Sequence, residues 1–214
     1  MDRVDLGAAR DNFIAYNLYI IQDRRVIEAM KHVPREAFVP QEHRYAAYED
    51  RPLSIGFGQT ISQPFIVALM VQALELKGSE KVLELGTGSG YEAAILAELA
   101  EHVVTTECIP ELAESAKQVL EKLGYSNIEV HIAGKILGWL EEAPYAAIIV
   151  SAGAPSIPQV LLEQLAWEGR LVIPVGSRWQ QELIKVTKYR KGNKMENLGG
   201  CYFVPLIGED AWEK

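Results

Sequence analysis

The strongest constraint on how this chain can fold is the run VLELGTGSGY at residues 82–91. Its apolar first half indicates a buried strand, and Gly86, Gly88 and Gly90 in the next five positions indicate a sharp turn that opens a helix. Glycine has no Cβ, so the backbone can take left-handed conformations there and a ligand can lie against bare amides. The run therefore predicts a strand, a ligand-binding turn and a helix in succession.

Strands and helices alternate after this run. We expect strands at residues 82–85, 103–107, 128–132 and 147–150, and helices at 91–99, 110–123 and 160–165. Such alternation predicts an α/β fold with a doubly wound, Rossmann-like parallel sheet and helices on both faces. Further strands are expected at 170–175, 183–189 and 199–205, with no helices between them. Gly192-Asn193 favours a hairpin, so these C-terminal strands should be antiparallel.

The spacing of the glycines points to one kind of ligand. The pattern is G-x-G-x-G, whereas a dinucleotide pyrophosphate site has G-x-G-x-x-G. Glu84, just before the first glycine, is a poor neighbour for phosphate and suits a ligand with an amino group or a sulfonium. Glu107 ends the next strand, where an acid can accept both hydroxyls of a ribose or, alternatively, serve only as a helix-end charge. S-adenosylmethionine fits these features better than NAD does.

The N-terminal part lacks this alternation. A helix from the cap residue Asp23 to Val33 is expected, then a polar, glycine-dotted loop at residues 54–64, then a helix from Phe65 to Leu76. Ser62 or Gln63 would serve as the N-cap of that last helix. We expect one domain over residues 1–214. Its residues 1–63 would form an N-terminal helical extension and active-site loop, and 64–214 the cofactor-binding α/β core.

Composition excludes several classes of protein. The formal net charge of −8 leaves no basic stripe for nucleic acid, and no apolar run approaches the roughly 20 residues that span a membrane. The cysteines, Cys108 and Cys201, are far apart and are interpreted as buried small hydrophobes in a reducing compartment. Acids and histidines show no metal-ligand spacing. We expect a cytoplasmic monomer without metal.

Two stretches resemble the signature motifs of the protein-L-isoaspartate O-methyltransferase family. They are GQTISQP at residues 58–64 and the glycine run at 82–91. Further similarity covers nearly the whole chain, at residues 33–40, 107–112, 171–176 and 203–206. The glycine run alone would indicate only an S-adenosylmethionine-dependent methyltransferase. The upstream serine stretch is much more specific.

The resemblance implies repair of damaged proteins and peptides. A methyl group would pass from S-adenosylmethionine to the α-carboxylate of an L-isoaspartyl residue, leaving S-adenosylhomocysteine, and the ester would close to a succinimide that returns normal aspartate. Ser62 matches the residue that the family marks as its active-site serine, for which we expect a positioning role. The implied cofactor-binding residues are Gln59, Thr60, Ile61, Ser62, Glu84, Gly86, Gly88, Ser89, Gly90, Glu107 and Cys108.

One segment departs from the family pattern. Ala133-Gly134-Lys135 stand where the family usually has Gly-Asp-Gly, whose aspartate can accept a hydrogen bond from the adenine amine. Gly134 has no side chain and Lys135 can only donate, so weaker cofactor binding is expected. Two alternatives therefore stay open: a non-catalytic isoaspartyl-binding paralogue with impaired cofactor binding, and a methyltransferase with another acceptor.

Overall fold

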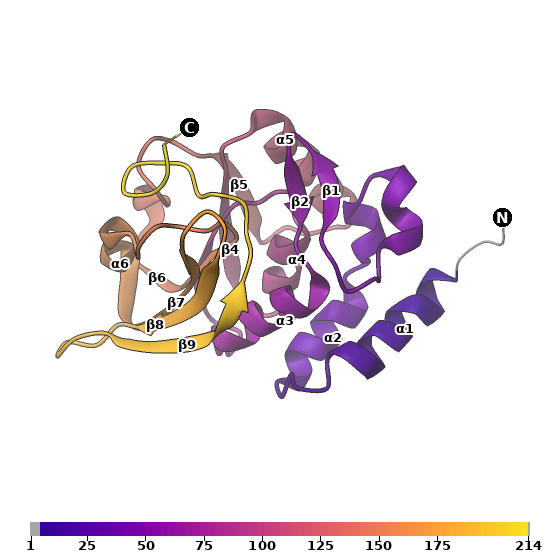
Figure 1. Cartoon of the computed structure of the whole chain (residues 1–214), viewed down its shortest axis with the longest axis horizontal. Helices are drawn as coiled ribbons and strands as arrows, with labels where there is room; N and C mark the ends of the chain where they lie inside the picture. The colour runs from indigo at the N-terminus through magenta and orange to yellow at the C-terminus, as the bar shows by residue number, and fades with distance from the viewer. Residues whose placement is uncertain (1–4, 214) are drawn as a thin grey trace.

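A seven-stranded sheet forms the centre of the molecule (Figure 1). The structure is a computed structural model that describes residues 5–213. The strand order is β5-β4-β3-β6-β7-β8-β9, parallel from β5 to β7 and antiparallel from β7 to β9. The strands are β3 (Lys81–Leu85), β4 (His102–Glu107), β5 (Ile128–Ile132), β6 (Tyr145–Val150), β7 (Leu165–Gly176), β8 (Gln181–Thr187) and β9 (Lys194–Cys201). The predicted α/β fold, mostly parallel with antiparallel C-terminal strands, is confirmed.

Helices surround the sheet and form the N-terminal extension. They are α1 (Leu6–Asn17), α2 (Arg24–His32), α3 (Pro64–Ala73), α4 (Tyr91–Ala97), α5 (Pro110–Lys122) and α6 (Gln159–Gln164), with 3₁₀ turns η1 (Arg35–Phe38), η2 (Gln41–Ala46) and η3 (Leu140–Glu142). The predicted cap of α2 is confirmed, because the Asp23 side chain accepts from the Arg25 amide at 2.9 Å. Helices α1 and α2 lie side by side, away from β7–β9 (Figure 1).

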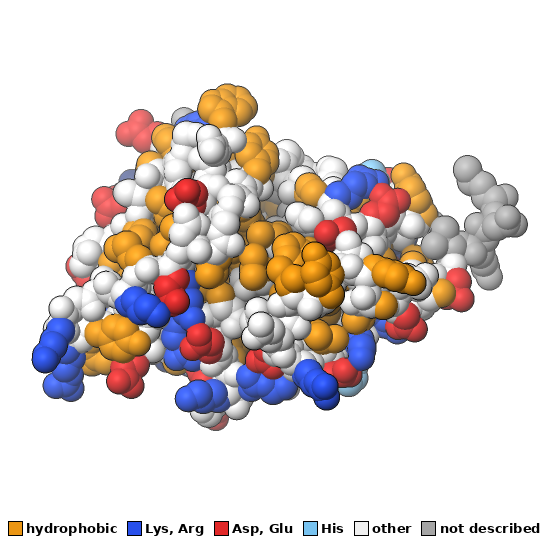
Figure 2. Space-filling model, turned by 60° about the horizontal axis from the view of Figure 1, so that its bottom comes forward, with side chains coloured by type: hydrophobic (Ala, Val, Ile, Leu, Met, Phe, Trp, Pro, Cys, Tyr) orange, Lys and Arg blue, Asp and Glu red, His pale blue; other side chains and the backbone are white. Residues whose placement is uncertain are grey.

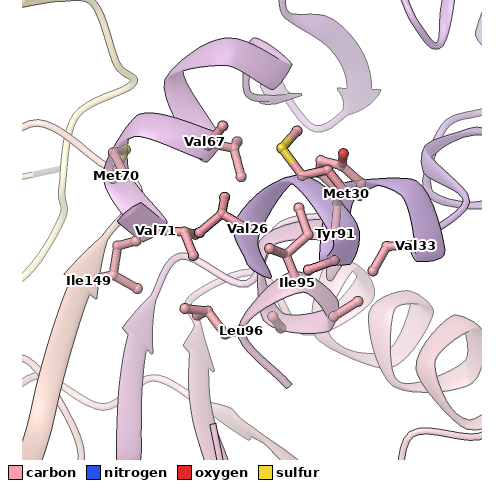
Figure 3. Close-up of a cluster of buried hydrophobic side chains, with 14 of the residues drawn as sticks. Val26, Met30, Val33, Val67, Met70, Val71, Tyr91, Ile95, Leu96 and Ile149 are labelled. Atoms are coloured by element: carbon pink, nitrogen blue, oxygen red, sulfur yellow. The ribbon is translucent and has the colours of Figure 1, made fainter. Parts of the chain in front are cut away.

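The core has two layers, one on each face of the sheet. On one face, side chains of α2, α3 and α4 pack together over the sheet, and Ile149 of β6 lies at the edge of this cluster (Figure 3). The next residue back along the strand, Ile148, belongs to the cluster on the other face, with Leu161 of α6. Both isoleucines are fully buried. Burying such a side chain stabilises the fold by about 1.5–3 kcal/mol, so both layers hold the sheet in place.

The segment 54–64 is not the loop that its composition predicts. It forms a hairpin of β1 (Leu53–Gly56) and β2 (Gln59–Ile61), in which Leu53 pairs with Ile61. The turn residues Phe57 and Gly58 both have positive φ, 55° and 71°, as a tight hairpin turn requires. Phenylalanine is rare in that conformation, which is why the turn was not evident from the sequence. The pairing of β2 with β1 fixes the backbone of Gln59–Ile61, directly before Ser62.

The last strand is also displaced from its prediction. The expected strand at 199–205 is instead β9 at Lys194–Cys201, although the predicted hairpin after β8 is confirmed by the pairing of Thr187 with Lys194. β9 is a mostly exposed edge strand with polar residues, so its sequence lacks the apolar signal of a buried strand. The apolar residues that follow leave the sheet, and Pro205 forms an isolated bridge with Gly153.

The surface carries charges of both signs. On the face in Figure 2, hydrophobic side chains gather near the centre, while Lys, Arg, Asp and Glu are interspersed along the lower margin. Among residues 5–213, no helix is long and apolar enough to cross a bilayer. The interpretation of both cysteines as buried is wrong for Cys108, which is exposed just after β4, while Cys201 is half-buried.

Candidate active site

A cavity that is partly open to solvent lies at the carboxyl ends of β3, β4 and β6. The strand order reverses beside β3, which is where ligands bind in open α/β sheets. Segments from across the sequence line the cavity. They are residues 59–62, 84–89, 91–92, 106–108, 133–134, 136–138, 151–152 and 204–207, together with Val67.

The structure brings together ten of the eleven predicted cofactor-binding residues. All except Gly90 line this cavity. Gly90 has a φ of 88° and is the N-cap of α4. A Cβ at this position would come within 3.3 Å of Ala116 and Leu120 on α5. Gly90 therefore allows the turn before α4 to lie close to α5, and it affects a ligand only through the shape of that turn.

Glu107 ties the glycine turn to the end of β4. Its Oε2 accepts from the Gly88 amide at 2.9 Å, and its Oε1 accepts from the Ile109 amide at 3.0 Å. The side chain is 5% exposed. Each carboxyl oxygen has a second lone pair, so the group can accept further hydrogen bonds, such as those of two ribose hydroxyls.

Two buried carboxyl groups lie beneath the glycine turn. Glu84 Oε2 accepts from the Thr105 hydroxyl at 2.5 Å, and the Ser151 hydroxyl donates to Glu92 Oε2. Burial raises the pKa of Glu84 well above its usual range; nearby Glu92 adds to this effect and the Thr105 hydrogen bond opposes it. Burial also raises the pKa of Glu92 to about 7, against the opposing hydrogen bond from Ser151.

Sequence reasoning missed Glu92. An acid in the first turn of a helix ordinarily lies at the surface, where the helix dipole favours it. Its sequence context indicates that Glu92 is not such a surface acid. The rest of α4 is apolar over Ala93–Ala97, and six of the seven helix residues are buried. A charged residue inside a helix with apolar neighbours all round points to a functional site.

A buried arginine and an aspartate hold the serine loop. Arg35 is fully buried, and its Nη2 donates to the Ser62 carbonyl oxygen at 2.8 Å. Asp50 Oδ1 accepts from the Phe65 amide at 3.0 Å, and Oδ2 accepts from the Gln63 side chain at 2.9 Å. The expectation that Ser62 or Gln63 is the N-cap of α3 is met by Gln63, although its side chain makes no capping hydrogen bond. Gln63 occupies the N-cap position, but Asp50 supplies the side-chain acceptor.

The residues present fit S-adenosylmethionine. Glu84, Glu92 and Glu107 give the cavity an acidic character that suits a ligand with a sulfonium and an ammonium group. The glycine turn presents backbone without side chains, since Gly86 and Gly88 have positive φ of 94° and 51°. Gly134 also lines the cavity, and a Cβ there would meet nothing within 4 Å.

The fold and this cavity define the class of the protein: it is an S-adenosylmethionine-dependent methyltransferase. The family model of protein-L-isoaspartate(D-aspartate) O-methyltransferase matches residues 13–211. The chain therefore belongs to the protein-L-isoaspartate(D-aspartate) O-methyltransferase family.

Relatives match over almost the full length. Protein-L-isoaspartate O-methyltransferase 1 of Syntrophobacter fumaroxidans is 55% identical over 98% of this chain and 99% of its own. The protein-L-isoaspartate O-methyltransferase of Methanoculleus marisnigri is 51% identical over 90% of this chain and 88% of its own. A solved Plasmodium falciparum structure, titled as a putative protein-L-isoaspartate O-methyltransferase in complex with S-adenosyl-L-homocysteine, has a TM-score of 0.76, 26% identity, and coverage of 92% and 96% of the two chains.

Proposed function

We propose that this protein transfers a methyl group from S-adenosylmethionine to the α-carboxylate of L-isoaspartyl residues in damaged proteins and peptides. One observation carries the proposal: the serine loop at Gln59–Ser62 and the glycine turn at Gly86–Ser89 line one cavity. A methyl donor held by the glycine turn would thus have its reactive end beside the loop that distinguishes this family. The names of the relatives support the choice of acceptor.

Methyl transfer to a carboxylate requires few catalytic groups from the protein. The cofactor supplies a methyl group on a positively charged sulfur, which is already a good electrophile. A main-chain α-carboxylate has a reference pKa of about 3.3–3.7, so it is ionised at neutral pH and needs no general base. The side chains must hold oxygen, carbon and sulfur in line. Such orientation can lower a barrier by about 7–11 kcal/mol.

We assign the roles of the site residues accordingly. Ser62 positions the acceptor by hydrogen bonding and forms no covalent intermediate. Glu107 accepts the ribose hydroxyls, while Gly86, Gly88 and Ser89 hold the methionine end. Glu84 faces its positive charges. The remaining residues that line the cofactor's part of the cavity are Gln59, Thr60, Ile61 and Cys108. We propose that no metal takes part in the reaction.

The remaining expectations also stand as proposals. Residues 1–63 act as a helical extension and active-site loop of one methyltransferase domain, and 64–214 as its cofactor-binding core; residues 1–4 and 214 lie outside those that the structure describes. We propose a monomer in the cytoplasm that binds no nucleic acid.

The test compares two peptides of identical composition. Purified protein is titrated calorimetrically with S-adenosylhomocysteine and is then assayed for methyl transfer to an isoaspartyl peptide and to its normal aspartyl twin. Binding with methylation of the isoaspartyl peptide alone is expected. Binding without transfer to either peptide would favour another acceptor. Methylation of both peptides to the same extent would contradict the repair function.

A further inference from the structure

Two buried carboxyl groups in the cofactor cavity have incomplete hydrogen bonding. Glu84 is 0% exposed and Glu92 is 8% exposed, and both line the cavity. Each has one oxygen, Oε1, that is buried and has no hydrogen-bond partner among the described residues. A buried polar atom without a partner is costly, by about 1–3 kcal/mol or more for a charged group. Such atoms in a binding cavity indicate a ligand of complementary charge.

The surroundings of the pair are acidic. Glu107 of β4 faces Glu84 from the neighbouring strand and acts on its proton affinity, as does Glu92 of α4. The hydroxyls that reach the pair are those of Thr105 on β4 and Ser151 after β6. Among residues 5–213, the cavity lining includes no lysine, arginine or histidine; its other titratable groups are Tyr91 and Cys108.

A buried cation, Arg35, lies close to the lining residue Tyr91. The Arg35 guanidinium is 4.8 Å from the ring centroid of Tyr91, on η1 rather than in the cavity lining. Two buried carboxyl groups that act on one another cannot both ionise without a large cost in free energy, because burial and like charge disfavour the second ionisation. The pair therefore keeps a proton, and holds it less firmly the more positive charge enters the cavity.

Building on the proposed function, we propose that Glu84 and Glu92 share a proton and that the protonation of this pair responds to the charge on the cofactor's sulfur. The pair releases a proton to solvent when the sulfonium of the methyl donor enters. It takes a proton up again when the neutral thioether product stands there. The donor is thus favoured over the product as pH rises, and Glu92 becomes a residue that determines specificity between the two.

The experiment measures protons directly. Binding of S-adenosylmethionine and of S-adenosylhomocysteine is measured by calorimetry at pH 7 in two buffers of different ionisation enthalpy, with wild type, Glu92→Gln and the control Glu121→Gln. Glu121 is an exposed acid on α5. We expect more proton release with the donor than with the product, in wild type and control, and little difference between the two ligands in Glu92→Gln.

The pH dependence of affinity gives a second readout. With the Glu92 pKa at about 7, the dissociation constant of the donor should fall about tenfold from pH 6 to pH 8 beyond the change seen in Glu92→Gln. The comparison with the variant removes the titration of the ligand's own amino group. Ser151→Ala removes a hydrogen bond that stabilises the ionised form, so it should move the midpoint to higher pH.

Equal proton release in wild type and Glu92→Gln, or parallel pH profiles, would overturn the inference. Methylation of the isoaspartyl peptide is followed on the same samples. Methylation with no proton linkage would defeat only this inference. Proton linkage with no methylation of that peptide would defeat only the proposed acceptor.

Discussion

The guanidinium of Arg35 and the carbonyl oxygen of Ser62 are joined by a hydrogen bond of 2.8 Å across 27 positions of sequence. The same guanidinium donates from Nε to the Ala47 carbonyl, also at 2.8 Å. One buried cation thus ties η1, the segment after η2 and the serine loop together. Its planar fork of donors suits this task, because two carbonyls in different directions are reached from one rigid group.

Replacing Arg35 by lysine should loosen the serine loop. A lysine keeps the charge but cannot present the same fork, so at least one carbonyl loses its donor, at a cost of about 1–3 kcal/mol in the free energy of unfolding. Urea unfolding measures this loss, and methyl-transfer rates should fall more than affinity for S-adenosylhomocysteine. Arg44→Lys, at an exposed position on η2, is the matched control. Identical unfolding curves for the two variants would contradict this role.

Ser62→Ala tests the positioning role of the serine. Loss of one hydrogen bond worth about 0.5–1.5 kcal/mol predicts a turnover about 2- to 12-fold lower, with unchanged affinity for S-adenosylhomocysteine. Ser115→Ala, on the exposed side of α5, should change neither quantity. Detection of a stable acyl-enzyme in the wild type by mass spectrometry would instead establish a covalent role.

Gly134→Asp should strengthen cofactor binding. The position lines the cavity, its φ is not positive, and a Cβ there meets nothing within 4 Å, so the new side chain enters without strain. The family resemblance places an acceptor for the adenine amine at this position. One added hydrogen bond predicts an affinity about 2- to 12-fold higher by calorimetry. Gly134→Ala adds a Cβ without an acceptor and should leave the affinity unchanged; equal gains in both variants would refute the explanation.

Glu92→Gln should stabilise the protein at neutral pH. The folded-state pKa of Glu92 is raised to about 7 from 4.5, so the folded protein holds a proton that the unfolded chain has lost. Wild-type stability should therefore fall as pH rises from about 4.5 to about 7 and then level off. The full shift corresponds to about 3 kcal/mol. Urea unfolding across this range should show the variant's advantage growing with pH, and Glu121→Gln should show none.

Secondary structure was predicted best where the local sequence pattern and the fold favour the same conformation. The strand, glycine turn and helix at residues 81–97 were expected nearly as found, because the apolar run and the three glycines act within ten positions. The cavity residues followed from the same turn and from the family resemblance. Gly90 shows the limit of this reasoning: a glycine in a binding motif can serve helix packing instead of the ligand.

Features that depend on distant partners were not visible in the sequence. The hairpin at Leu53–Ile61 depends on a phenylalanine with positive φ, and β9 is an edge strand without apolar alternation. The roles of Arg35 and Asp50 come from carbonyls and amides that lie 12 to 27 residues away. The apolar residues that follow Glu92 in α4 were a signal of its burial, but its proximity to Glu84 became recognisable only in the structure.

Residues 204–207 form part of the cavity lining, and this affects when the cavity can form during synthesis of the chain. Gln59 and Ile207 both line the cavity, so the cavity is complete only after both segments have left the ribosome. Completion of the cavity therefore depends on contacts between segments that are synthesised far apart in time.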